Sequence, residues 1–219
     1  MQQPKLSLTY NLKASTLKDN YPLIIMLHGY GSDENDLFGF ANELPEQFMI
    51  ISAKAPYALQ PYGNAWYAIN FDASQGKFSD IKQAKNSRDL VIKFIEEIKE
   101  NFKVDANRIT LLGFSQGTIL SFAIALSHPE LIKNVVGLSG YVDQNMLEYN
   151  FKSHDFSSLQ IYNSHGSVDQ VIPVDWARKN EAIFKELGID YVYEEFPVGH
   201  GVNPQNFMSF KRWLVQKDI

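Results

Sequence analysis

Residues 113–117 read G-F-S-Q-G, and their types and spacing make them the clearest candidate for chemistry in this sequence. An apolar run precedes them at residues 109–112, and a helix-like apolar run follows at 118–126. A G-x-S-x-G sequence between a strand and a helix is typical of a nucleophile elbow, a turn so sharp that a side chain two positions either side of the serine would clash. The pattern therefore predicts that Ser115 is a catalytic nucleophile, exposed at the C-terminal edge of a sheet.

A serine hydroxyl is a weak nucleophile at neutral pH and needs a base to remove its proton. His200 is the best candidate, because it lies in a turn of sequence P-V-G-H-G-V-N-P between the last expected strand and the last expected helix. The alternative is a histidine that leads a helix and bonds the backbone. His128 and His154 are expected at the surface or in a polar loop. His28 and His165 each end an expected strand before a glycine, where a role in bracing loops is expected.

The base needs an acid that holds its tautomer and stabilises the imidazolium. Asp169 is the candidate, because it comes a few residues after the strand expected at 160–163. The alternative is a turn residue of the Asx type. Asp175 competes for the role, but it is expected inside the start of a helix and pointing away. With Ser115 and His200, Asp169 completes the chain order of an α/β-hydrolase, which is Ser, then Asp, then His.

Acyl transfer also requires two backbone N–H groups that hold the developing oxyanion. Gln116, directly after the nucleophile, is expected to supply one. Tyr30 is expected to supply the other from the loop at 28–35, H-G-Y-G-S-D-E-N, where small residues let the backbone approach a substrate closely. The alternative is a plain tight turn. The loop lacks the lysine of a P-loop, and the sequence shows no G-x-G-x-x-G, H-E-x-x-H or clustered carboxylate ligands, so neither a metal nor a cofactor is predicted.

Alternating strands and helices are expected to position these residues. Strands are expected at residues 6–10, 23–27, 48–52, 109–112, 134–138, 160–163 and 190–196. Helices are expected at 33–44, after Asp80 with Gln83 completing a capping box, and at 115–127, 174–187 and 204–216. The alternation predicts an α/β fold in one domain spanning 1–219, with a mostly parallel sheet, helices on both faces, and no large cap domain. Every motif above follows an expected strand, where such sheets bind ligands.

Composition narrows the functional classes. The hydrophobic share of 45% and the charged share of 21% are ordinary for a globular domain of 219 residues. The net charge of -5 argues against nucleic acid as a partner. No apolar run reaches the roughly 18 residues of a membrane span, and the N-terminus lacks a signal-peptide pattern, so a cytoplasmic location is the default expectation. The absence of cysteine excludes disulfides and a thiol nucleophile.

Six motifs occur in one order along the chain: L-H-G-Y-G-S-D at 27–33, A-P at 55–56, W-Y at 66–67, G-F-S-Q-G at 113–117, H-G-S-V-D-Q-V-I-P at 165–173 and G-H-G at 199–201. In this combination the sequence resembles the phospholipase/carboxylesterase family of α/β-hydrolases, from about residue 21 to the C-terminus. That family includes the acyl-protein thioesterases and small bacterial carboxylesterases. The resemblance implies a triad of Ser115, Asp169 and His200 and an oxyanion hole of Tyr30 and Gln116 N–H.

The resemblance also implies that Trp66 and the neighbouring loop line an acyl pocket. That loop spans residues 54–79, a lid-like excursion rich in aromatics. Leu59, Trp66, Tyr67 and Phe71 are the substrate-binding candidates from it. The alternative is that these side chains anchor the excursion to the core, and both interpretations can hold together.

Two features depart from the family pattern. Thr118 stands where the family usually has a second glycine, and it is expected to narrow the space behind the nucleophile. Ser167 and Val168 replace an acidic residue that often follows H-G in the aspartate motif. The absence of a cysteine that could be lipidated favours the bacterial carboxylesterase branch over a dedicated depalmitoylase.

The sequence therefore predicts a serine carboxylesterase that hydrolyses ester or thioester bonds of hydrophobic acyl substrates through an acyl-enzyme intermediate. The alternatives are another activity of the same fold, such as a lysophospholipase, lactone hydrolase or perhydrolase, and a non-catalytic module that binds hydrophobic ligands. The expected partner is a small-molecule or lipid-like ester, with no nucleic acid and no transmembrane segment. Exposed aromatics around the lid would allow a homodimer contact, but nothing in the sequence demands one.

Overall fold

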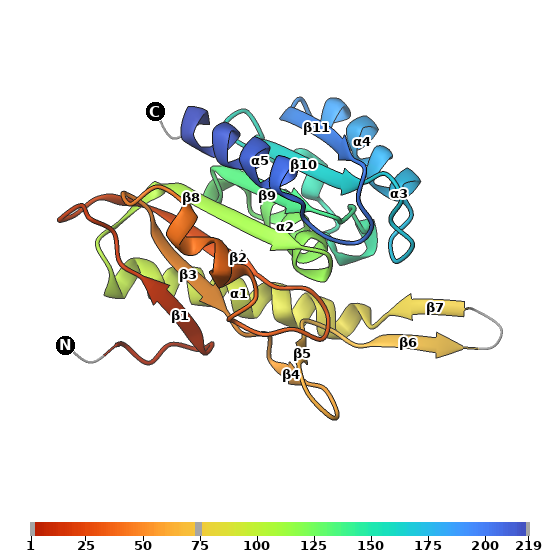
Figure 1. Cartoon of the computed structure of the whole chain (residues 1–219), viewed down its shortest axis with the longest axis horizontal. Helices are drawn as coiled ribbons and strands as arrows, with labels where there is room; N and C mark the ends of the chain where they lie inside the picture. Colours follow the sequence, from red (N-terminus) through yellow and green to blue (C-terminus); the bar gives the residue numbers. More distant parts are fainter. Residues whose placement is uncertain (1–2, 73–75, 218–219) are drawn as a thin grey trace.

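A seven-stranded sheet forms the centre of the fold, in the order β1-β3-β2-β8-β9-β10-β11 (Figure 1). The structure is a computed structural model that describes residues 3–72 and 76–217, and for residues 71, 72 and 76–78 the backbone alone. β1 pairs antiparallel with β3 at one edge, and the other neighbours pair in parallel. The strands are β1 (Tyr10–Lys13), β2 (Tyr21–Leu27), β3 (Met49–Ala53), β8 (Val104–Phe114), β9 (Asn134–Leu138), β10 (Gln160–Gly166) and β11 (Asp190–Phe196).

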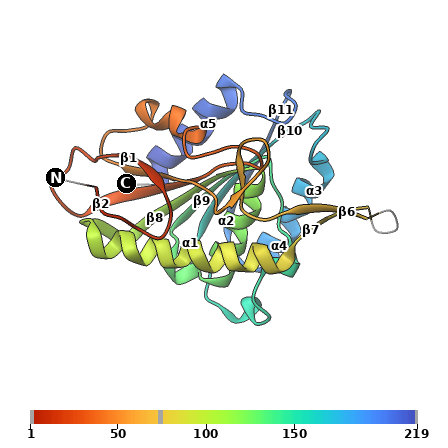
Figure 2. The same cartoon turned by 90° about the horizontal axis from the view of Figure 1, so that it is seen from below.

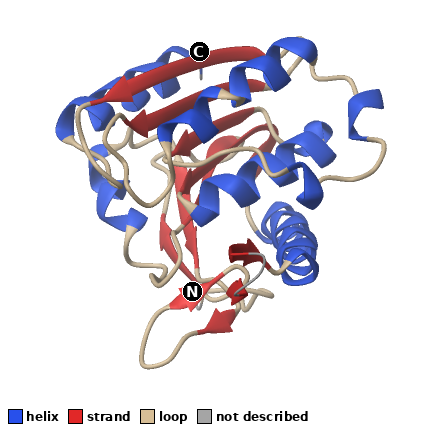
Figure 3. Ribbon diagram, turned by 90° about the vertical axis from the view of Figure 1, so that its right-hand side faces the viewer, coloured by secondary structure: helices blue, strands red, loops and turns tan. Residues whose placement is uncertain are grey.

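Helices cover both faces of this sheet, as Figure 2 and Figure 3 show. One face carries α1 (Ile81–Asn101), α2 (Gln116–Ser127) and α4 (Asn180–Glu186), and the opposite face carries the 3-10 helix η1 (Leu37–Glu43) and α5 (Pro204–Lys217). Short helices η2 (Pro129–Leu131), η3 (Gln144–Met146), η4 (Phe151–Ser153) and α3 (Val174–Arg178) complete the connections. The predicted α/β architecture with a mostly parallel sheet is confirmed.

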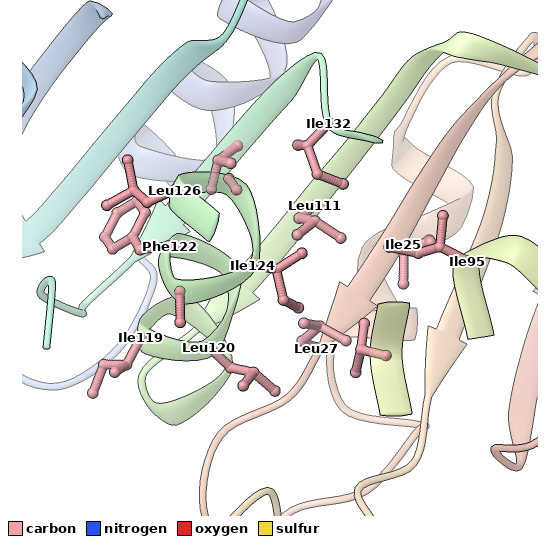
Figure 4. Close-up of a cluster of buried hydrophobic side chains, with 14 of the residues drawn as sticks. Ile25, Leu27, Ile95, Leu111, Ile119, Leu120, Phe122, Ile124, Leu126 and Ile132 are labelled. Carbon is pink, nitrogen blue, oxygen red and sulfur yellow. The ribbon is translucent and has the colours of Figure 1, made fainter. Parts of the chain in front are cut away.

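The core explains why β2 reads as an unbroken apolar run. Ile25 and Leu27 belong to the cluster on the α1 and α2 side, while Ile24 and Met26 belong to the cluster under η1 and α5. Successive side chains of a strand point to opposite faces, so a strand covered on both faces must be apolar throughout. In Figure 4, Ile124 of α2 lies over the sheet near Leu27. Every residue of α2 is buried, which fixes the start of this helix firmly against the sheet.

Two small hairpins form much of the excursion at 54–79. They are β4 (Tyr57–Ala58) with β5 (Asn64–Ala65), and β6 (Ile69–Asp72) with β7 (Gly76–Ser79). Asp80 caps α1 as predicted, since its carboxylate accepts from Gln83 N at 3.0 Å. The Gln83 side chain does not return to Asp80 as a capping box requires. It accepts from Ala68 N at 2.8 Å and so ties the second hairpin to α1.

Several predicted boundaries were wrong. The helix expected at 33–44 is the shorter 3-10 helix η1, preceded by a turn in which Asp33 accepts from Asn35 N at 2.8 Å. The strand expected at 6–10 begins at Tyr10, because Ser7 N donates to the Glu97 carboxylate at 2.7 Å instead of to a neighbouring strand. The helix expected at 174–187 is divided into α3 and α4.

The predicted absence of a cap domain agrees with the described part of the chain, where hairpins, loops and short helices stand at the C-terminal ends of the parallel strands. Within the same residues, no helix combines the length and the apolar character needed to cross a membrane.

Candidate active site

Ser115 lies at the turn between β8 and α2, with φ 53° and ψ -115°. A left-handed φ is unusual for a residue other than glycine and marks a backbone held in place by its surroundings. The two glycines explain how the turn closes. A Cβ at Gly113 would lie 2.6 Å from Gly117 C, and a Cβ at Gly117 would lie 1.9 Å from Leu27 O. The G-x-S-x-G pattern is thus required by contacts within the turn and with the end of β2.

His200 bridges the serine and an aspartate. Its Nε2 lies 2.9 Å from Ser115 Oγ, and its Nδ1 lies 2.7 Å from Asp169 Oδ2. A carboxylate only accepts hydrogen bonds, so Nδ1 carries the proton and Nε2 is left to accept the serine hydroxyl. The Phe114 ring packs against the imidazole with centroids 5.0 Å apart. The structure therefore brings together the three residues that the sequence analysis selected.

Asp169 is held by the turn that follows β10. Its Oδ1 accepts from Val171 N at 2.8 Å and from Ile172 N at 3.0 Å. Burial raises the pKa of this carboxyl, but hydrogen bonds from His200 and from the two backbone N–H groups outweigh that effect and leave the pKa below its ordinary value. Asp169 is therefore ionised at neutral pH. The competing Asp175 is exposed and pairs with Arg178 at 2.8 Å, away from the triad.

A second histidine contacts the same carboxylate. His165 is fully buried, and its Nε2 lies 2.9 Å from Ile172 O and 3.2 Å from Asp169 Oδ2. Burial lowers the pKa of His165, so the ring is neutral and Nε2–H faces both oxygens. From the sequence this histidine was expected to brace a loop, and its contact with the acid was not predicted. The spacing H-x-x-x-D was the available signal.

His28 holds the loop next to the nucleophile. Its Nε2 accepts from Ala55 N at 3.1 Å and its Nδ1–H donates to Gly29 O at 2.7 Å, while Trp66 Nε1 donates to His28 O at 2.9 Å. Burial lowers the pKa of His28, which agrees with a neutral ring. A Cβ at Gly29 would lie 3.5 Å from Ser115 Cβ, so this loop runs directly beside the serine.

The two candidate oxyanion donors come from different elements, the start of α2 and the loop after β2. Gln116 is the first residue of α2, so its N–H has no acceptor within the helix. Tyr30 belongs to the loop after β2, which is fixed where Gly31 N donates to Asn64 O at 2.9 Å and Asn64 N donates to Ser32 O at 2.8 Å. Both Tyr30 and Gln116 line the cavity described next.

A cavity of about 660 Å³ opens at the triad. Its lining comprises Tyr30, Tyr67, Ile69, Ser79, Ile81, Ser115, Gln116, Ile119, Tyr141, Asp143, Asn145, Val171, Ile172, Trp176 and His200. Of the substrate-binding candidates, Tyr67 is in this lining and Leu59 is not. Trp66 is also absent from it, because the ring is fully buried with its indole nitrogen on the backbone of the His28 loop. The side chain of Phe71 lies outside the described residues.

The Gln116 side chain has a role that the sequence analysis missed. Its Oε1 accepts from Trp66 N at 2.8 Å, and its Nε2 donates to Tyr67 O at 2.7 Å. The residue after the nucleophile therefore fixes the backbone of the segment that supplies one wall of the cavity. His128 and His154 take no part in this lining; His128 faces Glu130 at 3.3 Å.

Known protein sequences are similar to this chain over most of its length. The family model described as Phospholipase/Carboxylesterase matches residues 14–217. Acyl-protein thioesterase 1 of Yarrowia lipolytica is 27% identical over 208 residues, covering 87% of this chain and 89% of that protein. Acyl-protein thioesterase 1 of Candida albicans is 27% identical over 180 residues, covering 75% of this chain and 78% of that protein.

Solved structures show the same fold. A carboxylesterase from Mesorhizobium loti superposes with a TM-score of 0.82 at 18% identity, covering 97% of both chains. The Bacillus cereus carboxylesterase superposes with a TM-score of 0.81 at 16% identity, covering 96% of this chain and 94% of that one. Because the family model spans both the elbow and the turns that carry Asp169 and His200, the chain belongs to the phospholipase/carboxylesterase family of α/β-hydrolases.

Proposed function

We propose that this protein hydrolyses carboxylic esters and thioesters with Ser115 as nucleophile. The observation that supports this most directly is the continuous hydrogen-bonded chain from Ser115 Oγ through His200 to Asp169, at the wall of a cavity large enough for an acyl group. A serine with a hydrogen-bonded base and a third group orienting that base is the arrangement that activates a hydroxyl for covalent catalysis.

In the first half-reaction, Ser115 Oγ attacks the substrate carbonyl and its proton passes to His200 Nε2. The ionised Asp169 stabilises the resulting imidazolium through Nδ1–H. Tyr30 N–H and Gln116 N–H hold the oxyanion of the tetrahedral intermediate, and one such donor contributes roughly 10²- to 10³-fold in rate in a comparable enzyme. His200 then returns the proton to the departing alcohol or thiol, leaving an acyl ester on Ser115.

In the second half-reaction, water takes the place of the alcohol. His200 Nε2 accepts a proton from the water as its oxygen attacks the acyl carbon, and the same two N–H groups hold the oxyanion. The intermediate collapses, the proton passes to Ser115 Oγ, and the carboxylic acid leaves. The serine and the neutral imidazole are restored, so the cycle consumes one water for each ester.

The cavity supports substrates with a substantial apolar part. Ile69, Ile81, Ile119, Val171 and Ile172 contribute aliphatic surface to its lining. Small-molecule sites are usually mostly apolar, with a few polar groups that fix orientation. Relatives named carboxylesterase and acyl-protein thioesterase are consistent with both ester and thioester chemistry.

A fluorophosphonate probe tests the nucleophile. Wild-type protein is expected to be labelled, Ser115→Ala is expected to lose all labelling, and the exposed Ser167→Ala serves as the matched control that keeps it. A wild type that is not labelled would instead indicate a non-catalytic binding module. A panel of p-nitrophenyl esters and thioesters of increasing chain length, with lactones beside them, then identifies the preferred substrate class. A histidine base should give a hydrolysis rate that falls toward acid pH, and a flat profile from about pH 5 to 9 would contradict it.

A further inference from the structure

One carboxylate in the cavity takes no part in the proposed catalytic steps. Asp143 lines the cavity, and it is the only Asp or Glu among the described lining residues. Its Oδ1 accepts from Asn145 N and from Asn145 Nδ2, both at 3.0 Å, which caps η3. Capping uses one of its two oxygens. Among the ion pairs formed by described residues, none includes Asp143.

Aromatic side chains share the cavity with this carboxylate. Tyr67, Tyr141 and Trp176 all belong to the lining, and the Tyr141 and Trp176 rings meet edge to face with centroids 4.9 Å apart. Burial and, to a smaller extent, the charge of Asp143 together raise the pKa of Tyr141 to about 12. Burial likewise raises the pKa of Tyr67, with contributions from Tyr141 and Asp143. The carboxylate and both phenols line the same cavity, and both phenols remain neutral.

A negative charge in such a place selects among ligands. A purely apolar group that fills the cavity would strip water from Asp143 and offer nothing in exchange, which is unfavourable. A cationic group would compensate the carboxylate and at the same time lie beside aromatic rings, whose electron-rich faces attract ammonium groups. Specificity in binding sites often comes from such a penalty against the wrong ligand as much as from attraction to the right one.

We propose that the cavity binds an ammonium group between Asp143 and the aromatic side chains of Tyr67, Tyr141 and Trp176, so that the preferred substrates are esters or thioesters carrying a positive charge. The inference rests on the proposed function, because it concerns the substrate of Ser115. The ammonium group can belong to either side of the scissile bond, the alcohol or the acyl part, and the experiment separates the two.

Two pairs of esters of equal shape test the preference in the wild type. For the alcohol side, butyrylcholine is compared with 3,3-dimethylbutyl butyrate, in which carbon replaces the quaternary nitrogen. For the acyl side, ethyl 4-(trimethylammonio)butanoate is compared with ethyl 5,5-dimethylhexanoate. In one of the pairs, the cationic ester is expected to have a kcat/KM about tenfold higher than its neutral analogue, as an ammonium against aromatic faces and a carboxylate would give. Equal values in both pairs would overturn the inference while leaving the esterase function intact.

A variant assigns the preference to the carboxylate. Asp143→Asn keeps an oxygen that can cap η3 and removes the charge, so the ratio of cationic to neutral rates is expected to fall close to one. Asp155→Asn is the matched control, because Asp155 also accepts a backbone N–H two residues on, from Ser157 at 2.9 Å, but does not line the cavity. The control should keep the wild-type ratio. An unchanged ratio in Asp143→Asn would contradict the assignment.

A binding measurement needs neither turnover nor a folded variant. Choline and 3,3-dimethylbutan-1-ol are titrated into wild-type protein while tryptophan fluorescence is followed, since Trp176 lies in the cavity wall. Choline is expected to bind about tenfold more tightly than the neutral alcohol. Equal affinity for the two alcohols would overturn the inference, even if none of the four esters were hydrolysed. If choline bound more tightly but no ester were hydrolysed, the ammonium site would be supported and the esterase function would be contradicted.

Discussion

Replacing Gln116 by methionine tests whether the residue after the nucleophile fixes the wall of the cavity. The Gln116 amide is 2% exposed and bonds Trp66 N and Tyr67 O, both in residues that are almost completely buried. Methionine has a similar length but cannot replace either bond. A buried backbone group left without a partner costs about 1–3 kcal/mol, so two of them give an expected loss of about 2–6 kcal/mol in the free energy of unfolding.

Urea denaturation at pH 7 measures that loss, and steady-state kinetics measures its consequence for the site. Because Tyr67 lines the cavity, the variant is expected to raise KM for esters more than it lowers kcat. The oxyanion donor is the backbone N–H of residue 116 and survives the substitution, so fluorophosphonate labelling should persist. Gln205→Met, at an exposed position in the first turn of α5, is the matched control. A loss in Gln116→Met no larger than in the control would refute the bracing role.

Three further predictions follow from the same geometry. Asp169→Asn is expected to lower kcat by about 10⁴-fold, and a loss below about tenfold in steady-state assays would contradict its role as orienting acid. Gly117→Ala places a methyl group 1.9 Å from Leu27 O, so thermal denaturation should show a protein that unfolds at much lower temperature or fails to fold. Burial lowers the folded-state pKa values of His28 and His165 below the unfolded value of about 6.5. At a pH between the folded and the unfolded pKa, the unfolded chain binds more protons than the folded protein. The folded protein therefore loses stability as the pH falls below about 6.5. Urea denaturation from pH 8 to 5 should show this decline, and His165→Asn should make it shallower; an identical slope would count against a neutral buried His165.

The sheet could be predicted because its central strands are buried on both faces. β9, which is buried throughout, begins and ends where the apolar pattern placed it. The edge of the sheet formed by β1 was less predictable. The strand near the N-terminus starts later than the pattern indicated, because Ser7 N bonds Glu97, which lies 90 residues away in the sequence. A long-range contact of this kind has no signature in the local sequence.

The triad could be predicted because the signals for its three residues are local in the sequence. Each of its members lies in a short segment that combines the end of a strand with turn-forming residues, and that local context is visible without the fold. The contacts that hold the triad in place, in contrast, depend on how the chain folds. His165 reaches Asp169 only because the turn after β10 folds back, and Gln116 reaches Trp66 across 50 residues of sequence.

The 66–67 segment shows why an aromatic residue alone does not define a pocket. Trp66 and Tyr67 are adjacent, and both were expected to face the substrate. The two residues lie in a bend between β5 and β6. The indole of Trp66 turns inward to His28 O, while Tyr67 lines the cavity. Their order along the chain does not say which of the two faces inward; the bonds from Gln116 and His28 decide it.

Thr118 stands where the family usually has a second glycine. Its side chain was expected to narrow the space behind the nucleophile, and it does fill that space, toward β9 and away from the cavity. A Cβ at Gly140 would lie 2.5 Å from Thr118 Cβ, and one at Gly137 would lie 2.8 Å from Thr118 Cγ2, so these two glycines provide the room that the threonine occupies. Thr118 Oγ1 donates to Leu138 O at 2.7 Å and accepts from Leu138 N at 2.9 Å. Because Leu138 O also accepts from Ser115 N at 2.8 Å, the threonine fastens its helix to the same carbonyl that holds the backbone of the nucleophile.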